Sequence, residues 1–198
     1  MTRPGLLRRR LLLGAALALA VVRPARAQSE AEILIAAIQD GGKVIYLWHA
    51  ATNQKEMDTG RLGDRADQRN LSPASIQQAR DVGRAFRALL IPRDTAELAF
   101  GATRITVTMD LVADEYAGGQ LRNMLDATGR LLRMPPRPGT NRLLIGHRTP
   151  LEMVTGRPFP DNVLPEGAMA VFLPGDGEPR LLGTVSAQRL IHSAEVRR

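Results

Sequence analysis

Apolar positions along the chain repeat with a helical period in some segments and with a strand period in others. The segment 30–39 has apolar residues at helical spacing and stops at Gly41-Gly42, which predicts a helix with a glycine terminator. The apolar run over 44–47 predicts a strand. Ser72-Pro73 predicts a helix start, with serine as N-cap and proline in the first turn. The buried stripe predicted for this helix consists of Ile76, Ala79, Val82, Phe86 and Leu89.

The second half of the chain continues this alternation of helices and strands. We predict helices over 94–100 and 121–132, and strands over 105–109, 143–145, 168–173 and 180–184. The last two strands flank Pro174-Gly-Asp-Gly177 and therefore predict an edge hairpin. The segment 186–198 is expected to be a polar C-terminal tail. Alternating strands and helices favour an α/β sandwich over an all-helical domain.

The first 27 residues have the pattern of a signal peptide. Three arginines, Arg8 to Arg10, precede an apolar run from Leu11 to Val22, and Ala25-Arg26-Ala27 offers small residues for cleavage after Ala27. The apolar run is shorter than the roughly 20 residues that cross a bilayer, so we expect no stable membrane anchor after cleavage. Both a Sec signal and a twin-arginine signal fit. We expect a periplasmic or secreted protein.

This signal changes how the charge of the chain is interpreted. The chain has 27 basic and 20 acidic side chains, but six of the arginines lie in residues 1–27, which leaves 21 against 20. We therefore expect no nucleic-acid partner. The chain contains no cysteine, which excludes disulfides, thiolate catalysis and thiolate metal sites. By length, residues 28–185 are expected to form one domain.

Two of the three histidines follow apolar, strand-like runs. His49 ends Lys43-Val-Ile-Tyr-Leu-Trp-His49, and His147 ends Arg142-Leu-Leu-Ile-Gly-His147. The carboxyl edge of an α/β sheet presents reactive groups in this way, so we expect both imidazoles in one pocket. Such a pair suits phosphoryl transfer, with one ring as nucleophile and the other as a donor to phosphate oxygens. No HExxH motif or ligand spacing of histidines predicts a metal or another cofactor, and His192, in the predicted tail, is expected to be inert.

These segments together resemble the histidine phosphatase superfamily, and most closely its small exported bacterial members. The resemblance rests on His49, Thr52 three residues later, the loop 67–73 that leads into a helix, and Gly146-His147; it extends from about Gly41 to Thr184. It implies a three-layer α/β/α sandwich with a mostly parallel, phosphoglycerate mutase-like sheet. It also implies hydrolysis of a small phosphorylated metabolite through a phosphohistidine on His49, with His147 holding phosphate oxygens and no metal.

Two phosphate-binding arginines of that family are absent from the matching positions. Trp48 stands where an arginine precedes the nucleophile, and an indole offers one neutral donor instead of a charged fork. Ile91 stands at the second position, in a region where a short stretch that includes a central strand is missing, so we expect a sheet that lacks one central strand. Loss of one preorganised donor costs about a hundred- to a thousand-fold in rate. Weak or impaired activity is therefore expected.

Other candidate site residues are assigned less directly. Arg148 beside His147, Arg69 in the loop after the first strand, and Arg93 or Arg104 are possible replacements for the missing arginines. Thr52 could donate a hydroxyl to phosphate or cap a turn. The resemblance implies an acid that protonates the leaving group, and we choose Glu115 among three candidates that also include Asp110 and Asp114.

Three hypotheses remain open at this point. The chain is an exported phosphomonoesterase that acts through His49, or a catalytically inactive pseudophosphatase that binds an inorganic anion or a partner, or a truncated product that folds poorly. A phosphate bound between His49 and His147 would fit the first two hypotheses and exclude the third. Turnover would separate the first from the second.

Overall fold

The structure is a computed structural model that describes residues 29–53, 55–56, 69–89, 106 and 108–197. Its α-helices and strands, in chain order, are α1 (Glu30–Gln39), β1 (Val44–Trp48), α2 (Pro73–Ala88), α4 (Leu121–Arg133), β2 (Arg142–Gly146), α5 (Arg148–Thr155), β3 (Met169–Leu173), β4 (Arg180–Val185) and α6 (Ala187–Val196). Three short 3₁₀ helices precede α4, namely η2 (Met109–Leu111), η3 (Asp114–Tyr116) and η4 (Gly118–Gln120).

The four described strands form one mixed sheet with the order β2-β1-β3-β4. Only β1 and β2 run parallel, whereas β3 pairs antiparallel with both β1 and β4. The expected mostly parallel sheet is therefore wrong for the described strands. The predicted hairpin over 168–184 is confirmed, and β4 is its edge strand.

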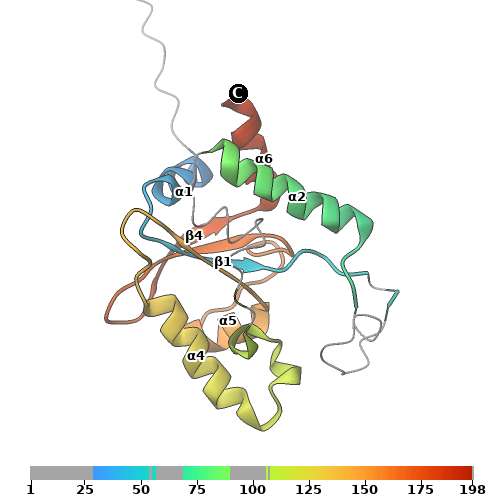
Figure 1. The fold of residues 1–198 in the computed structure, drawn as a ribbon, viewed down its shortest axis with the longest axis vertical. Coiled ribbons are helices and arrows are strands. Elements are labelled where there is room, and N and C mark those ends of the chain that lie inside the picture. Colours follow the sequence, from blue (N-terminus) through green and yellow to red (C-terminus); the bar gives the residue numbers. More distant parts are fainter. Residues whose placement is uncertain (1–28, 54, 57–68, 90–105, 107, 198) are drawn as a thin grey trace, which may run out of the picture.

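Helices cover both faces of this sheet (Figure 1). On one face, α1, α2 and α6 pack on a cluster that includes Ile45, Phe86 and Leu190, all fully buried. On the other face, α4 and α5 pack on a second cluster that includes Tyr46 and Leu132. The described chain is thus a mixed α/β protein with a four-stranded sheet and five α-helices.

Local sequence explains where α1 and α2 begin. Ser29 and Glu32 form a capping box at the start of α1, in which each side chain bonds the other residue's backbone N–H. Ser72 caps α2 by accepting from the Ser75 N–H, and Pro73 occupies the first turn, as predicted. In the predicted stripe of α2, Val82, Phe86 and Leu89 are buried, but Ile76 is 40% exposed.

Two predictions for the remaining segments need correction. The expected polar tail after Ser186 instead forms α6, which buries Ala187, Leu190 and Ala194 in the cluster that it shares with α1, α2 and the sheet. Within the expected strand over 105–109, Met109 begins a 3₁₀ helix. The predicted helix over 94–100 and the predicted loss of a strand near Ile91 lie outside the described residues.

In the part of the chain that the structure describes, no helix combines the length and the apolar composition that a membrane span requires.

Candidate functional site

The parallel pairing of β1 and β2 brings two histidines together. Trp48 lies opposite Gly146 at the end of the ladder, and the His49 N–H donates to the Gly146 carbonyl at 3.2 Å, so His49 and His147 leave the sheet side by side. Their ring centroids are 4.7 Å apart with the planes at 64°. The two residues that the sequence placed in one pocket are in edge contact.

Backbone carbonyls set the orientation of both rings. The Nδ1 atom of His49 lies 2.9 Å from the Ala50 oxygen, and the Nδ1 atom of His147 lies 3.3 Å from the Leu111 oxygen. Because a carbonyl oxygen only accepts, Nδ1 carries the hydrogen in each ring. In the neutral form of His49, the lone pair is therefore on Nε2, the atom that remains for attack or for a ligand.

Tyr46 fixes the backbone beneath His147. Its hydroxyl donates to the His147 carbonyl at 2.9 Å, and the ring is fully buried. Burial raises the pKa of the Tyr46 hydroxyl well above its usual range, so the group stays protonated and continues to donate. A side chain at Gly146 would place its Cβ 2.3 Å from the Tyr46 oxygen, which explains why glycine precedes His147.

Arg148 is held close to the histidine pair by two contacts. Its guanidinium lies over the Trp48 ring, 4.4 Å from the centroid, and it also forms an ion pair with Asp161. The Trp48 ring in turn meets the His49 ring edge-on at 6.0 Å. A positive charge thus stands beside Trp48, but Asp161 already neutralises part of it.

The other predicted site residues take different places. Thr52 forms an isolated antiparallel bridge with Leu71, and Arg69 is exposed just before that bridge. Glu115 lies exposed in η3, whereas Asp110 and Asp114 are partly buried. The element before η3 does reach the histidines, since Leu111 in η2 bonds the His147 ring. Arg93 and Arg104 lie outside the described residues.

A carboxylate holds the segments on either side of the Thr52–Leu71 bridge together. Glu56 accepts from the Asn70 N–H at 2.8 Å and from the Asn53 side chain at 3.0 Å. These bonds, the Asn70 backbone bond first, lower the pKa of the Glu56 carboxyl below its usual value. The Thr52–Leu71 bridge is therefore stabilised by the Glu56 carboxylate, which is ionised at neutral pH.

An apolar pocket of about 180 Å³ opens beside His49. Its apolar lining comes from β1, β2, α2 and the adjoining loops, through Leu47, Ala50, Leu71, Ala79, Val82 and Ile145. Gln78 and Gly167 complete the wall, and no arginine or lysine lines it among the described residues. The sequence did not predict this pocket. The sequence feature that could have indicated it is Ala79, a small residue in a helix stripe of larger side chains.

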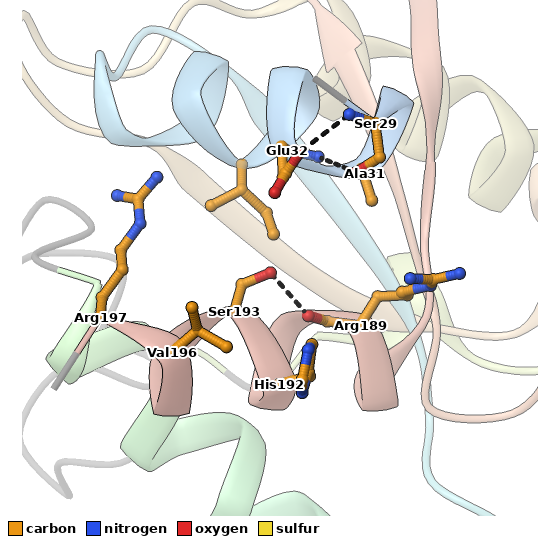
Figure 2. Close-up of a pocket in the computed structure, with 9 residues that line it drawn as sticks. Ser29, Ala31, Glu32, Arg189, His192, Ser193, Val196 and Arg197 are labelled. Carbon is orange, nitrogen blue, oxygen red and sulfur yellow. Dashed lines mark hydrogen bonds between the residues drawn. The ribbon is translucent and has the colours of Figure 1, made fainter. Parts of the chain in front are cut away.

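A second pocket, of about 280 Å³, lies between α1 and α6 and includes His192 (Figure 2). Its hydroxyl and carboxylate groups serve the helices themselves, because Ser193 donates to the Arg189 carbonyl and Glu32 caps α1. His192 is exposed on α6, the helix that forms where a tail was predicted. It lies apart from the two paired histidines. This pocket offers no activated nucleophile.

In the described ranges, no three side chains among histidine, aspartate and glutamate gather where they could hold a metal ion. No protein-family model, curated protein or solved structure matches the chain.

Proposed function

We propose that the protein is a histidine phosphatase-like phosphomonoester hydrolase, weak or impaired, in which His49 is the nucleophile. The observation that carries this proposal is the contact of the His49 and His147 rings at 4.7 Å, at the end of two adjacent parallel strands. The Ala50 carbonyl supports it, because its bond to Nδ1 leaves the Nε2 lone pair of His49 for attack on phosphorus.

In the proposed reaction, His49 Nε2 attacks the phosphorus of a small phosphomonoester. A P–N bond forms as the P–O bond to the alcohol breaks, and the leaving oxygen takes a proton from an acid for which Glu115 is our candidate. Water then attacks the phosphohistidine and gives a proton to the carboxylate that protonated the alcohol, the P–N bond breaks, and inorganic phosphate leaves. His147 stabilises the charge on the phosphoryl oxygens through Nε2 when its ring is protonated. Neither a metal nor an organic cofactor takes part.

A catalytically inactive pseudophosphatase that binds an anion or a partner is the second candidate. It is favoured by the state of Arg148, whose guanidinium is already engaged by Trp48 and Asp161. An arginine that must give up an ion pair to bind phosphate contributes less than a preorganised one.

We further propose that the chain is exported through its arginine-rich N-terminal segment and acts in the periplasm or outside the cell. Its substrates would then be small phosphorylated metabolites of that compartment.

Hydrolysis of an aryl phosphate by residues 28–198, from mildly acidic to neutral pH, tests the proposed activity. We expect turnover that falls to background in His49→Ala and by about a hundredfold in His147→Ala, the loss typical of one preorganised donor. His192→Ala is the matched control, because it removes the exposed third histidine from α6 and should leave the rate unchanged.

Circular dichroism of each variant shows whether a lost rate reflects lost folding. Equal background rates from folded wild type and folded His49→Ala would refute hydrolysis through phosphohistidine and favour the pseudophosphatase.

A further inference from the structure

The apolar pocket beside His49 is built from two surfaces that face each other. Its floor is the sheet, where Leu47 of β1 lies opposite Ile145 of β2 in the parallel register. Its other wall is α2, which contributes Gln78, Ala79 and Val82 from adjacent turns of one helix face. Residues of the same helix face further along, such as Phe86, fill the space over the sheet completely.

The helix face that lines the pocket has a small side chain at Ala79. The later residues of the stripe, Val82, Phe86 and Leu89, are larger, and Ile145, which lines the pocket from β2, is 48% exposed. Gly167 closes the far side, with its N–H donating to the Trp48 and His49 carbonyls at 3.0 Å each. The same backbone that anchors His49 therefore also shapes the pocket.

His49 belongs to both the pocket and the histidine pair. His49 lines the apolar pocket, and its ring also contacts the His147 ring. A ligand whose anionic group binds at the two imidazoles would direct its remaining atoms past His49 into the pocket. Among the described lining residues, the polar side chains are His49 and the amide of Gln78. Hydroxyl-rich groups would therefore lose more hydrogen bonds to water there than they could replace.

We propose that this pocket is the subsite for an apolar substituent of the phosphomonoester, a single aromatic ring or a short alkyl chain. The proposal rests on the function proposed above, because it takes the histidine pair as the site of the phosphate. Its volume sets the size of the substituent: a protein cavity of about 150 Å³ accommodates benzene, and this pocket measures about 180 Å³. The preferred ligands are aryl and alkyl phosphates, and sugar phosphates are disfavoured.

Binding of non-hydrolysable phosphonates tests the subsite without requiring turnover. Isothermal titration calorimetry on residues 28–198 would compare benzylphosphonate with methylphosphonate, which share the anionic group and differ in the ring. We expect benzylphosphonate to bind at least about tenfold more tightly, because burial of a ring in an apolar site favours binding. Equal affinities, or no binding of either compound, would overturn the subsite.

A pair of substitutions on α2 locates the ring. Ala79→Leu fills the pocket and should abolish the preference for benzylphosphonate, whereas Ala74→Leu adds the same side chain at an exposed position of that helix and should preserve it. Thermal unfolding of both variants checks that they fold. A preference retained in folded Ala79→Leu would place the ring elsewhere and overturn the proposal.

Hydrolysis separates failure of the subsite from failure of the proposed function. Phosphate release from benzyl phosphate should exceed that from glycerol 3-phosphate about tenfold in kcat/KM. Tight benzylphosphonate binding without any phosphate release would refute the hydrolase and support the subsite in a pseudophosphatase. Phosphate release at equal rates from both esters would support the hydrolase and overturn the subsite.

Discussion

The Tyr46 hydroxyl leaves room at Gly146 for a hydrogen atom but not for a side chain. A Cβ built at this position would lie 2.3 Å from the Tyr46 oxygen and 3.2 Å from the Leu111 carbonyl oxygen. Both of these oxygens also contact His147, one through its backbone and one through its ring. The orientation of the second histidine therefore depends on the absence of a side chain at the preceding residue.

We predict that Gly146→Ala lowers the free energy of unfolding by about 1 to 3 kcal/mol, the usual cost of forcing an extra carbon into a packed site. Tyr46→Phe should cost about 1 kcal/mol through loss of the bond to the His147 carbonyl. The double variant should lose less than the sum, because removing the hydroxyl makes room for the methyl group. Urea unfolding measures the cycle, and strict additivity would show that the contact is not the cause.

Among single residues, the sequence predicted the histidine pair but not its supports. In an α/β fold, a histidine at the end of a β-like run is expected at the carboxyl edge of the sheet. The sequence therefore predicts that His49 and His147 lie close together. The role of Tyr46 depends on a hydroxyl meeting a residue 101 positions away, which no local pattern encodes. Arg148 was placed by adjacency to His147, but its ion pair with Asp161 came from a loop that the sequence did not position.

At the scale of elements, one buried side chain joins the ends of three of them. Asn141 is 2% exposed and lies just before β2. Its Nδ2 donates to the Ile38 carbonyl in the last turn of α1 at 2.7 Å, and its Oδ1 accepts from the Lys43 N–H before β1 at 2.9 Å. The two parallel strands that present the histidines are therefore aligned at their opposite end by an amide.

We expect Asn141→Ala to destabilise the protein by about 2 to 5 kcal/mol, because it leaves a buried carbonyl and a partly buried N–H without these partners. Asn123→Ala is the control, since its amide bonds Gln120 on an exposed surface of α4 and its loss should cost no more than about 0.5 kcal/mol. Chemical denaturation of both variants gives the comparison. Equal small losses would mean that Asn141 does not link the elements.

The sequence predicted well the helices with one buried face and the short apolar strands. Helices α1, α2 and α4 follow from apolar spacing, because burial on one side forces that spacing. Strands β1 and β2 follow from continuous apolar runs, which suit a sheet that is covered on both faces. The short helix α5, which begins directly after His147, was not predicted, because its eight residues bury only Pro150 and Leu151 and so show no helical period. The direction of β3 relative to β1 was also not predicted. A run of five apolar residues has the same pattern in a parallel strand and in an antiparallel strand.

At the scale of the whole molecule, the C-terminal segment is part of the core. Leu190 of α6 is fully buried among residues of α1, α2 and the sheet. The segment was interpreted as a polar tail because two of its three buried residues are alanines between charged and polar neighbours. Small apolar residues give a weak periodic signal even where they pack closely.

Leu190→Ala should therefore lower the free energy of unfolding by about 2 to 5 kcal/mol, as for other large-to-small changes in a core. Val196→Ala, at a position of the same helix that is 72% exposed, should change it by no more than about 0.5 kcal/mol. Thermal unfolding of both variants provides the test. A negligible effect of Leu190→Ala would restore the interpretation of this segment as a tail.

The parallel pairing of β1 with β2 also affects the order in which the parts of the protein fold. The two histidines meet only after a chain segment of roughly a hundred residues has closed on itself, as the separation of Tyr46 and His147 indicates. Closing so long a loop costs entropy before any contact compensates for it, whereas the hairpin of β3 and β4 forms from neighbouring residues. The histidine pair is thus a property of the completed fold, and a nascent or partly unfolded chain would not possess it.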